Sequence, residues 1–332
     1  MSTMKILVTG SAGHLGEALV RTLRRSGTEV IGLDTNASAF TDVQGSITDR
    51  PLVRRCVAGV GAVIHAASLH KPHLVTHSKQ AFIDVNVSGT LNLLEEAAAA
   101  GARTFLYTST TSAFGQSLHP APGDPAAWIT EDTPSIPKNM YGLSKSMAEG
   151  LCEIFHGRDG MSCLVLRTSR FFPEQDDKKA IRDGYEDANT KMNELLHRRA
   201  DVEDVVAAHL LALEKAASLP FARYIISATT PFGPADVARL GIDAPSVLRE
   251  RVPAFEAEFR RRGWKMFPTI DRVYVNDKAR RDLGWNPKYD FASALRDLAA
   301  DKDPRSPLAR SIGSKGYHED GPFEDGPYPV ES

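Results

Sequence analysis

A tyrosine and a lysine four positions apart, Tyr141 and Lys145, are the residues whose types and spacing most clearly allow chemistry. Residues at i and i+4 share one face of a helix, so the phenol and the ammonium are expected to lie close together. A nearby ammonium favours the phenolate, and we therefore expect the pKa of Tyr141 to fall from about 10 toward neutrality. Such a phenol can exchange a proton with a hydroxyl or carbonyl group at physiological pH.

A glycine-rich segment near the start of the chain indicates a second function, the binding of a dinucleotide diphosphate. Gly10, Gly13 and Gly16 follow an apolar stretch, Lys5–Thr9, and open a helical pattern, Leu15–Ser26. The first glycine permits a tight turn, the second lets the backbone approach a pyrophosphate, and the third allows close packing of helix on strand. Unpaired N–H groups at the predicted helix start favour the negative charge of the diphosphate.

Asp34 ends a second predicted strand, Glu29–Asp34. A carboxylate at this place can accept hydrogen bonds from both adenosine ribose hydroxyls and would repel a 2′-phosphate. Thr35 and Asn36 follow it, with no arginine to neutralise that phosphate. The cofactor is therefore expected to be NAD rather than NADP, the alternative being that Asp34 only caps a turn.

Short apolar segments alternate with helical patterns through the first half of the chain, which is typical of a parallel sheet covered by helices. The later strands are expected at Ala62–His65, Thr104–Ser109, Cys163–Arg167 and Arg223–Ala228, and the later helices at Gln80–Ala100, Met140–His156 and Asp201–Ser218. These elements predict an α/β fold with a doubly wound parallel (Rossmann) sheet and a small C-terminal substrate lobe.

The domain organisation follows from where this pattern changes. Residues 1–170 are predicted to form the NAD-binding domain, and residues 171–300 to complete the sheet and form the substrate lobe. Residues 301–332 are rich in Gly and Pro toward their end and are expected to form an extended tail. The segment from Gln116 to Lys138 is expected to be a long loop, and loops of that length are usually functional.

Composition excludes several classes of partner. Forty basic against forty-two acidic residues leave a net charge of −2, which gives no electrostatic reason to expect nucleic acid or a membrane surface. No apolar run approaches the ~20 residues that span a bilayer, and Gly10 interrupts the first apolar stretch too early for a secretory signal.

Three cysteines without a motif spacing suggest reduced thiols. We expect a cytoplasmic enzyme.

The motifs together resemble the extended short-chain dehydrogenase/reductases, the NAD-dependent epimerase/dehydratase family, over most of the chain. Gly45–Asp49 resembles the stretch that touches adenine, although that family usually has an acid where Ser46 stands. His65–Ser68 resembles the strand end beneath the cofactor, and Asn86 matches the asparagine that begins the long central helix. The resemblance assigns to the cofactor Gly10, Gly13, His14, Leu15, Gly16, Asp34, Ser46, Ile47, Ala66, Ala67, Ser68, Asn86, Tyr141 and Lys145.

The same resemblance implies a catalytic set. Phe105–Gly115 places Thr110 at the catalytic Ser/Thr position of the family, beside Tyr141 and Lys145. Thr110 would hold the substrate oxygen while hydride passes to or from the nicotinamide, and Lys145 would also bind the nicotinamide ribose. The substrate-facing candidates are His70, Thr111 and Arg170.

Four histidines crowd a short segment, and the spacing of His70, His73 and His77 raises a metal hypothesis. Pro72 interrupts any helix that would align them, so we expect no metal. The remaining alternatives are a substrate-facing role for His70 or His73, or plain loop histidines.

The substrate class is left open by two departures from the family pattern. Arg170 stands where relatives acting on nucleotide sugars have an asparagine, and Pro268–Arg272 stands where they tend to have Arg-x-Gly-Asp-Val. Arg170, Arg198, Arg199 and Arg272 could instead hold a diphosphate or the carboxylate of a small acid. The hypotheses are a net NAD-dependent oxidoreductase acting on a sugar, sugar acid or other secondary alcohol, a nucleotide-sugar epimerase or dehydratase that recycles its NAD, and an NAD-sensing regulator.

Members of this family are usually dimers joined by two long helices of each subunit. The helices predicted at Gln80–Ala100 and Met140–His156 could form such an interface, with Leu91, Leu94 and Ala98 on one apolar face. The alternative is a monomer that buries this face against its own sheet. We expect a homodimer acting on a small-molecule substrate.

Overall fold

The computed structural model describes residues 4–121 and 123–316, which form two compact units. Unit 1 contains the residues up to Ala113, then Pro137–Thr168 and Val205–Tyr224. Unit 2 contains Phe114–Ile136, Ser169–Asp204 and the residues from Ile225 onward. Each unit is therefore assembled from separate stretches of the sequence.

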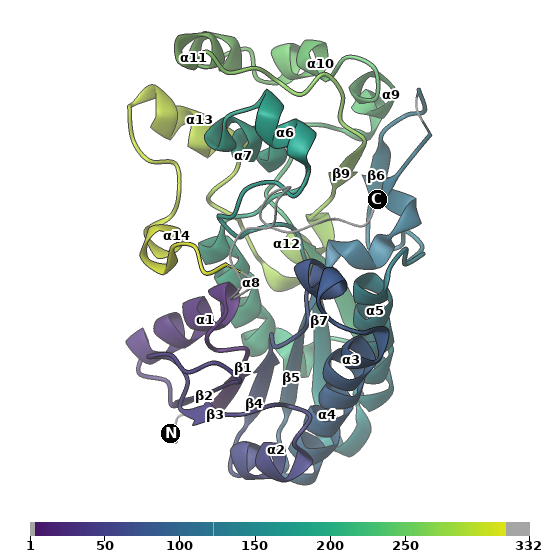
Figure 1. Cartoon of the computed structure of the whole chain (residues 1–332), viewed down its shortest axis with the longest axis vertical. Coiled ribbons are helices and arrows are strands. Elements are labelled where there is room, and N and C mark those ends of the chain that lie inside the picture. The colour runs from purple at the N-terminus through teal and green to yellow at the C-terminus, as the bar shows by residue number, and fades with distance from the viewer. Residues whose placement is uncertain (1–3, 122, 317–332) are drawn as a thin grey trace. The chain divides into compact units, whose positions relative to one another are not determined.

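A seven-stranded sheet with the order β3-β2-β1-β4-β5-β7-β8 is the framework (Figure 1). Its strands are β1 (Ile6–Thr9), β2 (Val30–Asp34), β3 (Val43–Gln44), β4 (Ala62–His65), β5 (Thr104–Thr110), β7 (Ser162–Thr168) and β8 (Ala222–Ile226). β1 pairs in parallel with β2 on one side and with β4 on the other. The strand order reverses at this point, and parallel sheets bind ligands outside the carboxyl ends of the strands at such a switch. The predicted doubly wound parallel sheet is confirmed.

The core of unit 1 lies between the sheet and the helices α2 (Arg50–Val57), α4 (Gly89–Ala99) and α5 (Met140–Phe155). Alternate strand residues, such as Val63 in β4 and Phe105 and Tyr107 in β5, point into it because strand side chains alternate between faces. Helix α1 (His14–Arg25) contacts β1 and β2. Asn139 begins α5 by accepting a hydrogen bond from the Gly142 N–H, which fixes where the helix of Tyr141 starts.

The helix predicted at Gln80–Ala100 is not one regular helix. It consists of α3 (Lys79–Phe82), the π-helical segment η2 (Ile83–Ser88) and α4. A π-helical turn holds more residues than an α-helical one, and such turns are frequent at functional sites. Hydrophobic periodicity could not reveal it, because the change involves hydrogen bonding rather than residue type.

Unit 2 has a two-stranded parallel sheet of β6 (Ala127–Ile129) and β9 (Arg272–Tyr274). Around it are α6 (Lys179–Gly184), α7 (Asp187–Leu195), α9 (Val237–Leu240), α10 (Ala244–Arg251), α11 (Phe255–Arg262), α12 (Asp277–Leu283), α13 (Phe291–Ala299) and α14 (Pro307–Ile312). Trp285 is buried here, and its indole N–H donates to the Asp204 carbonyl at 3.0 Å. Helix α8 (Val202–Lys215) starts at the end of one unit 2 segment.

Several expectations from the sequence need correction. The predicted loop from Gln116 to Lys138 contains β6, whose partner β9 lies far along the chain, so no local pattern could identify it. The predicted extended tail contains α14, which Ser306 begins by accepting a hydrogen bond from the Ala309 N–H. The final segment, from Gly321 to Ser332, lies outside the described residues. Within the described part of the chain, no helix is both long and apolar enough to cross a membrane.

Candidate active site

The glycine loop between β1 and α1 leaves no room for side chains. Gly10 has φ +74°, and a Cβ atom there would lie 2.7 Å from the Ala67 nitrogen. A Cβ atom on Gly16 would lie 1.9 Å from the Gly10 carbonyl oxygen. The loop therefore needs glycine at both positions, and it brings the backbone of β1 against the segment after β4. This cradle of bare backbone at a helix start fits a dinucleotide diphosphate.

The first residues of α1 offer backbone rather than side chains to such a ligand. Gly13 occupies the position before the helix, and no side-chain bond caps the start of α1. Leu15 is buried in the core, whereas His14 is half-buried. Backbone N–H groups at a helix start favour a negatively charged ligand.

Asp34 is fixed beside the glycine loop by two backbone hydrogen bonds. One carboxylate oxygen accepts from the Ala12 N–H at 2.9 Å, and the other accepts from the Asn36 N–H at 2.8 Å. A carboxylate oxygen can accept more than one hydrogen bond, so both oxygens retain capacity for ribose hydroxyls. The turn-capping alternative and the ribose-binding role are therefore compatible.

Other residues predicted to touch the cofactor surround this loop in different ways. Ser46 is half-buried, whereas Ile47 is buried against Gly89, so the Ile47 side chain belongs to the core. Ala66 and Ala67 lie against Gly10. The His65 side chain is fully buried between Thr9 and Thr90, which hydrogen-bond its two ring nitrogens at 2.7 and 2.9 Å. Both ring nitrogens of His65 are therefore occupied within the protein.

Asn86 in the π-helical segment ties two parts of the site together. Its side-chain oxygen accepts from the Leu69 N–H at 2.7 Å, and its amide donates to the Leu69 carbonyl and to Ser144 Oγ, each at 3.0 Å. It thereby joins the segment after β4 to α5. The amide is fully buried, so Asn86 positions its neighbours, which include Ala67–His70 on one side and Tyr141–Lys145 on the other.

Tyr141 lies against Thr110, and Lys145 follows one helical turn further along α5. Tyr141 and Thr110 are both buried and share a side-chain hydrogen bond. Lys145 is 2% exposed, and its Nζ atom donates to the Thr108 carbonyl oxygen at 2.6 Å and lies 4.2 Å from the centre of the Tyr107 ring. Strand β5 and helix α5 therefore present a phenol, a hydroxyl and an amine from one packed region.

The predicted direction of the Tyr141 pKa shift is wrong for this structure. Burial raises the pKa of Tyr141 to about 12, and the hydrogen bond from Thr110 only partly opposes this effect. Burial also lowers the pKa of Lys145 to about 7. The i, i+4 spacing could not reveal this outcome, because the Lys145 amine is turned to the Thr108 carbonyl and the Tyr107 ring.

Of the substrate-facing candidates, His70 and Thr111 belong to unit 1. The His70 ring lies 6.1 Å from the Tyr141 ring, between centres, and burial lowers the pKa of His70 to about 3. It is therefore neutral at physiological pH and can both donate and accept hydrogen bonds. Thr111 is buried directly after β5. Among the described residues no group of three His, Cys, Asp or Glu side chains is arranged to hold a metal ion.

Arg170, the third candidate, belongs to an ion cluster in unit 2. Its guanidinium lies 2.6 Å from Asp176, 3.3 Å from Asp177 and 3.2 Å from Glu194. Arg198 and Arg199 also pair with Glu194, at 3.0 and 2.7 Å. Three arginines thus face three carboxylates, so the cluster is formally neutral. The arginines stand out in the sequence as possible anion ligands, whereas their acidic partners lie up to 24 positions from Arg170 and have no local signal that would link them to it.

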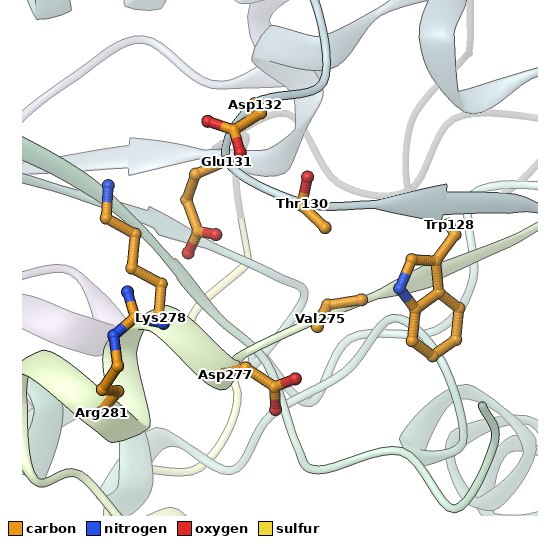
Figure 2. Close-up of a pocket in the computed structure, with 8 residues that line it drawn as sticks. All are labelled: Trp128, Thr130, Glu131, Asp132, Val275, Asp277, Lys278 and Arg281. Carbon is orange, nitrogen blue, oxygen red and sulfur yellow. The ribbon is translucent and has the colours of Figure 1, made fainter. Parts of the chain in front are cut away.

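A hollow of about 430 Å³ lies elsewhere in unit 2, between β6 and α12 (Figure 2). It is lined by Trp128, Thr130, Glu131, Asp132, Val275, Asp277, Lys278 and Arg281. The cations of α12 and the indole of Trp128 lie at opposite ends, with Glu131 between them. Glu131 accepts a hydrogen bond from the Ile225 N–H at 2.8 Å, so part of its role is to fix β8. None of the predicted site residues lines this hollow.

Comparison with known proteins agrees with this geometry. A model described as "NAD dependent epimerase/dehydratase family" matches residues 6–226. A dTDP-glucose 4,6-dehydratase of Streptomyces antibioticus is 29% identical over 88% of this chain and 90% of its own length. A 3 beta-hydroxysteroid dehydrogenase/Delta 5→4-isomerase of Mycobacterium tuberculosis is 26% identical over 88% of this chain and 89% of its own. A protein of Sinorhizobium fredii, y4nG, is 34% identical, but the chain matches only 39% of its length.

The fold has solved counterparts as well. A short-chain dehydrogenase/reductase superfamily protein from Agrobacterium tumefaciens, crystallised with bound NAD, superimposes with a TM-score of 0.64 at 24% identity, over 92% of this chain and 97% of that one. The parallel sheet and the glycine loop are thus those of the short-chain dehydrogenase/reductase fold. Within that class, the chain belongs to the NAD-dependent epimerase/dehydratase family.

The position of Asp34 generates a prediction about cofactor choice. The unmodified protein is expected to bind NAD at least about tenfold tighter than NADP, because the carboxylate accepts from the ribose hydroxyls and repels a 2′-phosphate. Asp34→Asn removes the charge and should narrow this gap, as measured by titration calorimetry with both cofactors. The matched control is Asp84→Asn, which removes an exposed carboxylate of η2. A preference of the unmodified protein for NADP would contradict the assignment.

Proposed function

We propose that the protein is an NAD-dependent oxidoreductase acting on a secondary hydroxyl or carbonyl of a sugar, sugar acid or related small molecule. The observation that carries this proposal is the buried trio of Thr110, Tyr141 and Lys145 in the same unit as a glycine loop that excludes side chains. NAD, held by Gly10–Gly16 and Asp34, would supply the hydride acceptor. All three catalytic residue types are retained, which argues against a purely NAD-sensing regulator.

In this proposal the chain's own residues move the proton and hold the substrate oxygen. Tyr141, with its pKa raised to about 12, is a protonated phenol at physiological pH and is suited to donate to a substrate carbonyl oxygen. Thr110, already hydrogen-bonded to Tyr141, offers a second hydroxyl to the same oxygen. Lys145 would bind the nicotinamide ribose. When the reaction runs toward oxidation, the Tyr141 oxygen would have to be deprotonated first, and it would then accept the proton of the substrate hydroxyl while the hydride passes to NAD.

The ion cluster of unit 2 supports a substrate without a diphosphate. The Glu194 side chain is fully buried and compensated by Arg170, Arg198 and Arg199. Removing a partner from a buried charge typically costs about 3–5 kcal/mol, so these arginines are poorly placed to be recruited by a ligand. Arg272, the fourth predicted anchor, pairs with Asp271 at 2.6 Å.

The second candidate is a nucleotide-sugar epimerase or dehydratase that recycles its bound NAD. The alignment with the dTDP-glucose 4,6-dehydratase over 88% of this chain favours it. The steroid dehydrogenase/isomerase aligns over the same share and is named for a net oxidation, so overall likeness does not separate the two reaction types. The charge balance around Glu194 is therefore the reason to place the net oxidoreductase first.

We further propose that the protein is a homodimer that uses α5. Leu143, Met147 and Ile154 of this helix are apolar and 42%, 43% and 58% exposed. The face predicted on the neighbouring helix needs correction, because Leu94 is fully buried in the core of its own unit. An exposed apolar stripe on α5 is thus the feature that an interface would cover.

Loss of the Tyr141 hydroxyl tests the catalytic assignment. Tyr141→Phe should lower turnover by at least about a hundredfold, because it removes the proton donor while keeping the ring. NAD affinity should stay within about threefold of the unmodified protein, since only the hydroxyl is lost and the ring remains in place. Steady-state kinetics and calorimetry measure the two quantities. Unchanged turnover would show that another group transfers the proton.

The reaction type is tested by supplying NAD with candidate sugars, sugar acids and nucleotide sugars and following NADH absorbance. Stoichiometric NADH from a free sugar is the expected result, because the arginines of unit 2 that could hold a diphosphate or a carboxylate are already paired. Stoichiometric NADH from a sugar acid would equally support the net oxidoreductase. Product analysis by mass spectrometry accompanies each assay. Interconversion of a nucleotide sugar without net NADH would contradict the net oxidoreductase and establish the second candidate.

Met147→Glu tests the proposed dimer. A carboxylate buried in an apolar interface is costly, so the variant should sediment as a monomer where the unmodified protein sediments as a dimer. Ile242→Glu is the control, because Ile242 is 70% exposed and lies outside α5. A dimer that persists in Met147→Glu would place the interface elsewhere.

A further inference from the structure

Glu149 continues the helical face of α5 that carries Tyr141 and Lys145, four residues beyond the lysine. It is 1% exposed, yet its carboxylate has partners on every side. It accepts from Ser109 Oγ at 2.6 Å, from Arg167 Nη2 at 2.7 Å and from Arg223 Nε at 3.0 Å. All of these residues belong to unit 1.

One of these bonds reaches the end of β5, where the catalytic hydroxyl stands. Ser109 lies between Thr108, whose carbonyl oxygen receives the Lys145 amine, and Thr110. The hydrogen bond from Ser109 to Glu149 of α5 therefore fixes Thr108 and Thr110 relative to that helix. The same carboxylate thus contacts the strand that carries Thr110 from the helix that carries Tyr141 and Lys145.

Glu149 also lies one helical turn beyond Lys145 on the same face of α5, so its negative charge is near the buried amine. Burial lowers the pKa of Lys145 to about 7, and Glu149 acts in the opposite direction. The other titratable groups near the amine are neutral at physiological pH: burial lowers the pKa of His65 and His70 and raises the pKa of Tyr107 and Cys152. Glu149 therefore supplies the negative charge that stabilises an ammonium in this apolar setting.

We propose that Glu149 is a positioning residue that fixes the end of β5 and places a negative charge one helical turn from Lys145, with Arg223 as its second, more exposed counter-ion. This inference deepens the proposed function, because it rests on the assignment of Lys145 to the nicotinamide ribose. Arg167 is 4% exposed and serves as the permanent counter-ion. Arg223 is 28% exposed and also pairs with Glu153 at 2.8 Å, so it is the adjustable partner.

The test measures NAD binding by calorimetry from about pH 6 to about pH 9, which needs no knowledge of the substrate. In the unmodified protein, affinity should fall as pH rises through the Lys145 pKa of about 7, because the amine loses its charge. Glu149→Gln removes the negative charge that stabilises the Lys145 ammonium, so the pKa of Lys145 should drop. The fall in NAD affinity should then begin at lower pH. Affinity at about pH 8 should drop by about tenfold, while the two proteins converge at the acid end, where Lys145 is charged in both.

Arg223→Gln gives a second variant with the opposite sign. This change removes a positive charge beside Glu149, so the pKa of Lys145 should rise. The fall in NAD affinity should therefore move to higher pH. This variant does not leave a buried arginine unpaired and is expected to fold even where Glu149→Gln does not. Glu29→Gln is the control: it removes a 60% exposed carboxylate that pairs with Lys5 rather than with Arg223, and it should leave the profile unchanged.

The outcomes separate this inference from the proposed function. A purely structural role for Glu149 would weaken NAD binding equally at every pH and leave the Arg223→Gln profile in place, and that result would overturn the proposal. Absence of NAD binding by the unmodified protein would instead overturn the proposed function. Shifts of opposite sign in Glu149→Gln and Arg223→Gln, with none in Glu29→Gln, would support the positioning role.

Discussion

A lysine amine held in a packed interior is the constraint on which the arrangement of unit 1 depends. An ammonium that is 2% exposed requires an acceptor, an opposing charge and neutral neighbours, because its desolvation is costly. The Thr108 carbonyl is the acceptor, and Glu149 provides the charge. Thr108 belongs to β5, which also carries Thr110, and Glu149 belongs to α5, which also carries Tyr141. The packing of β5 against α5 that buries Lys145 therefore also positions Thr110 and Tyr141.

The glycine loop is joined to the helix of Lys145 through the segment that follows β4. Gly10 approaches Ala67 so closely that no Cβ atom fits, and Asn86 then fixes Leu69 to α5. Backbone contact and one buried amide thus connect the start of α1, the segment after β4 and the helix of Tyr141. This chain of contacts explains how a cofactor site and a proton donor, contributed by distant parts of the sequence, come together in one unit.

The features that the sequence predicts well are those with local causes. Three such features are the glycine loop, Asp34 at the end of an apolar strand, and the spacing of Tyr141 and Lys145. Each can be recognised from residue types within a few positions of one another. The features it does not predict depend on distant partners or on burial. The Tyr141 pKa rises because the surrounding protein excludes water, β6 needs β9 more than a hundred positions away, and Arg170 is paired by acids whose role only the fold discloses. Residue type alone suggested anion-binding arginines, whereas their surroundings indicate a balanced ion cluster.

The positions of the tryptophans make the two units distinguishable by spectroscopy. The chain has three, and Trp128, Trp264 and Trp285 all belong to unit 2. Trp285 is 1% exposed, so its emission should be blue-shifted in the folded protein and should move to longer wavelength when water reaches it. Intrinsic tryptophan fluorescence therefore reports on unit 2, while unit 1 contributes tyrosines such as Tyr107 and Tyr141. Comparing emission with far-ultraviolet circular dichroism during unfolding would show whether the cofactor-binding unit and its neighbour lose structure in one cooperative step.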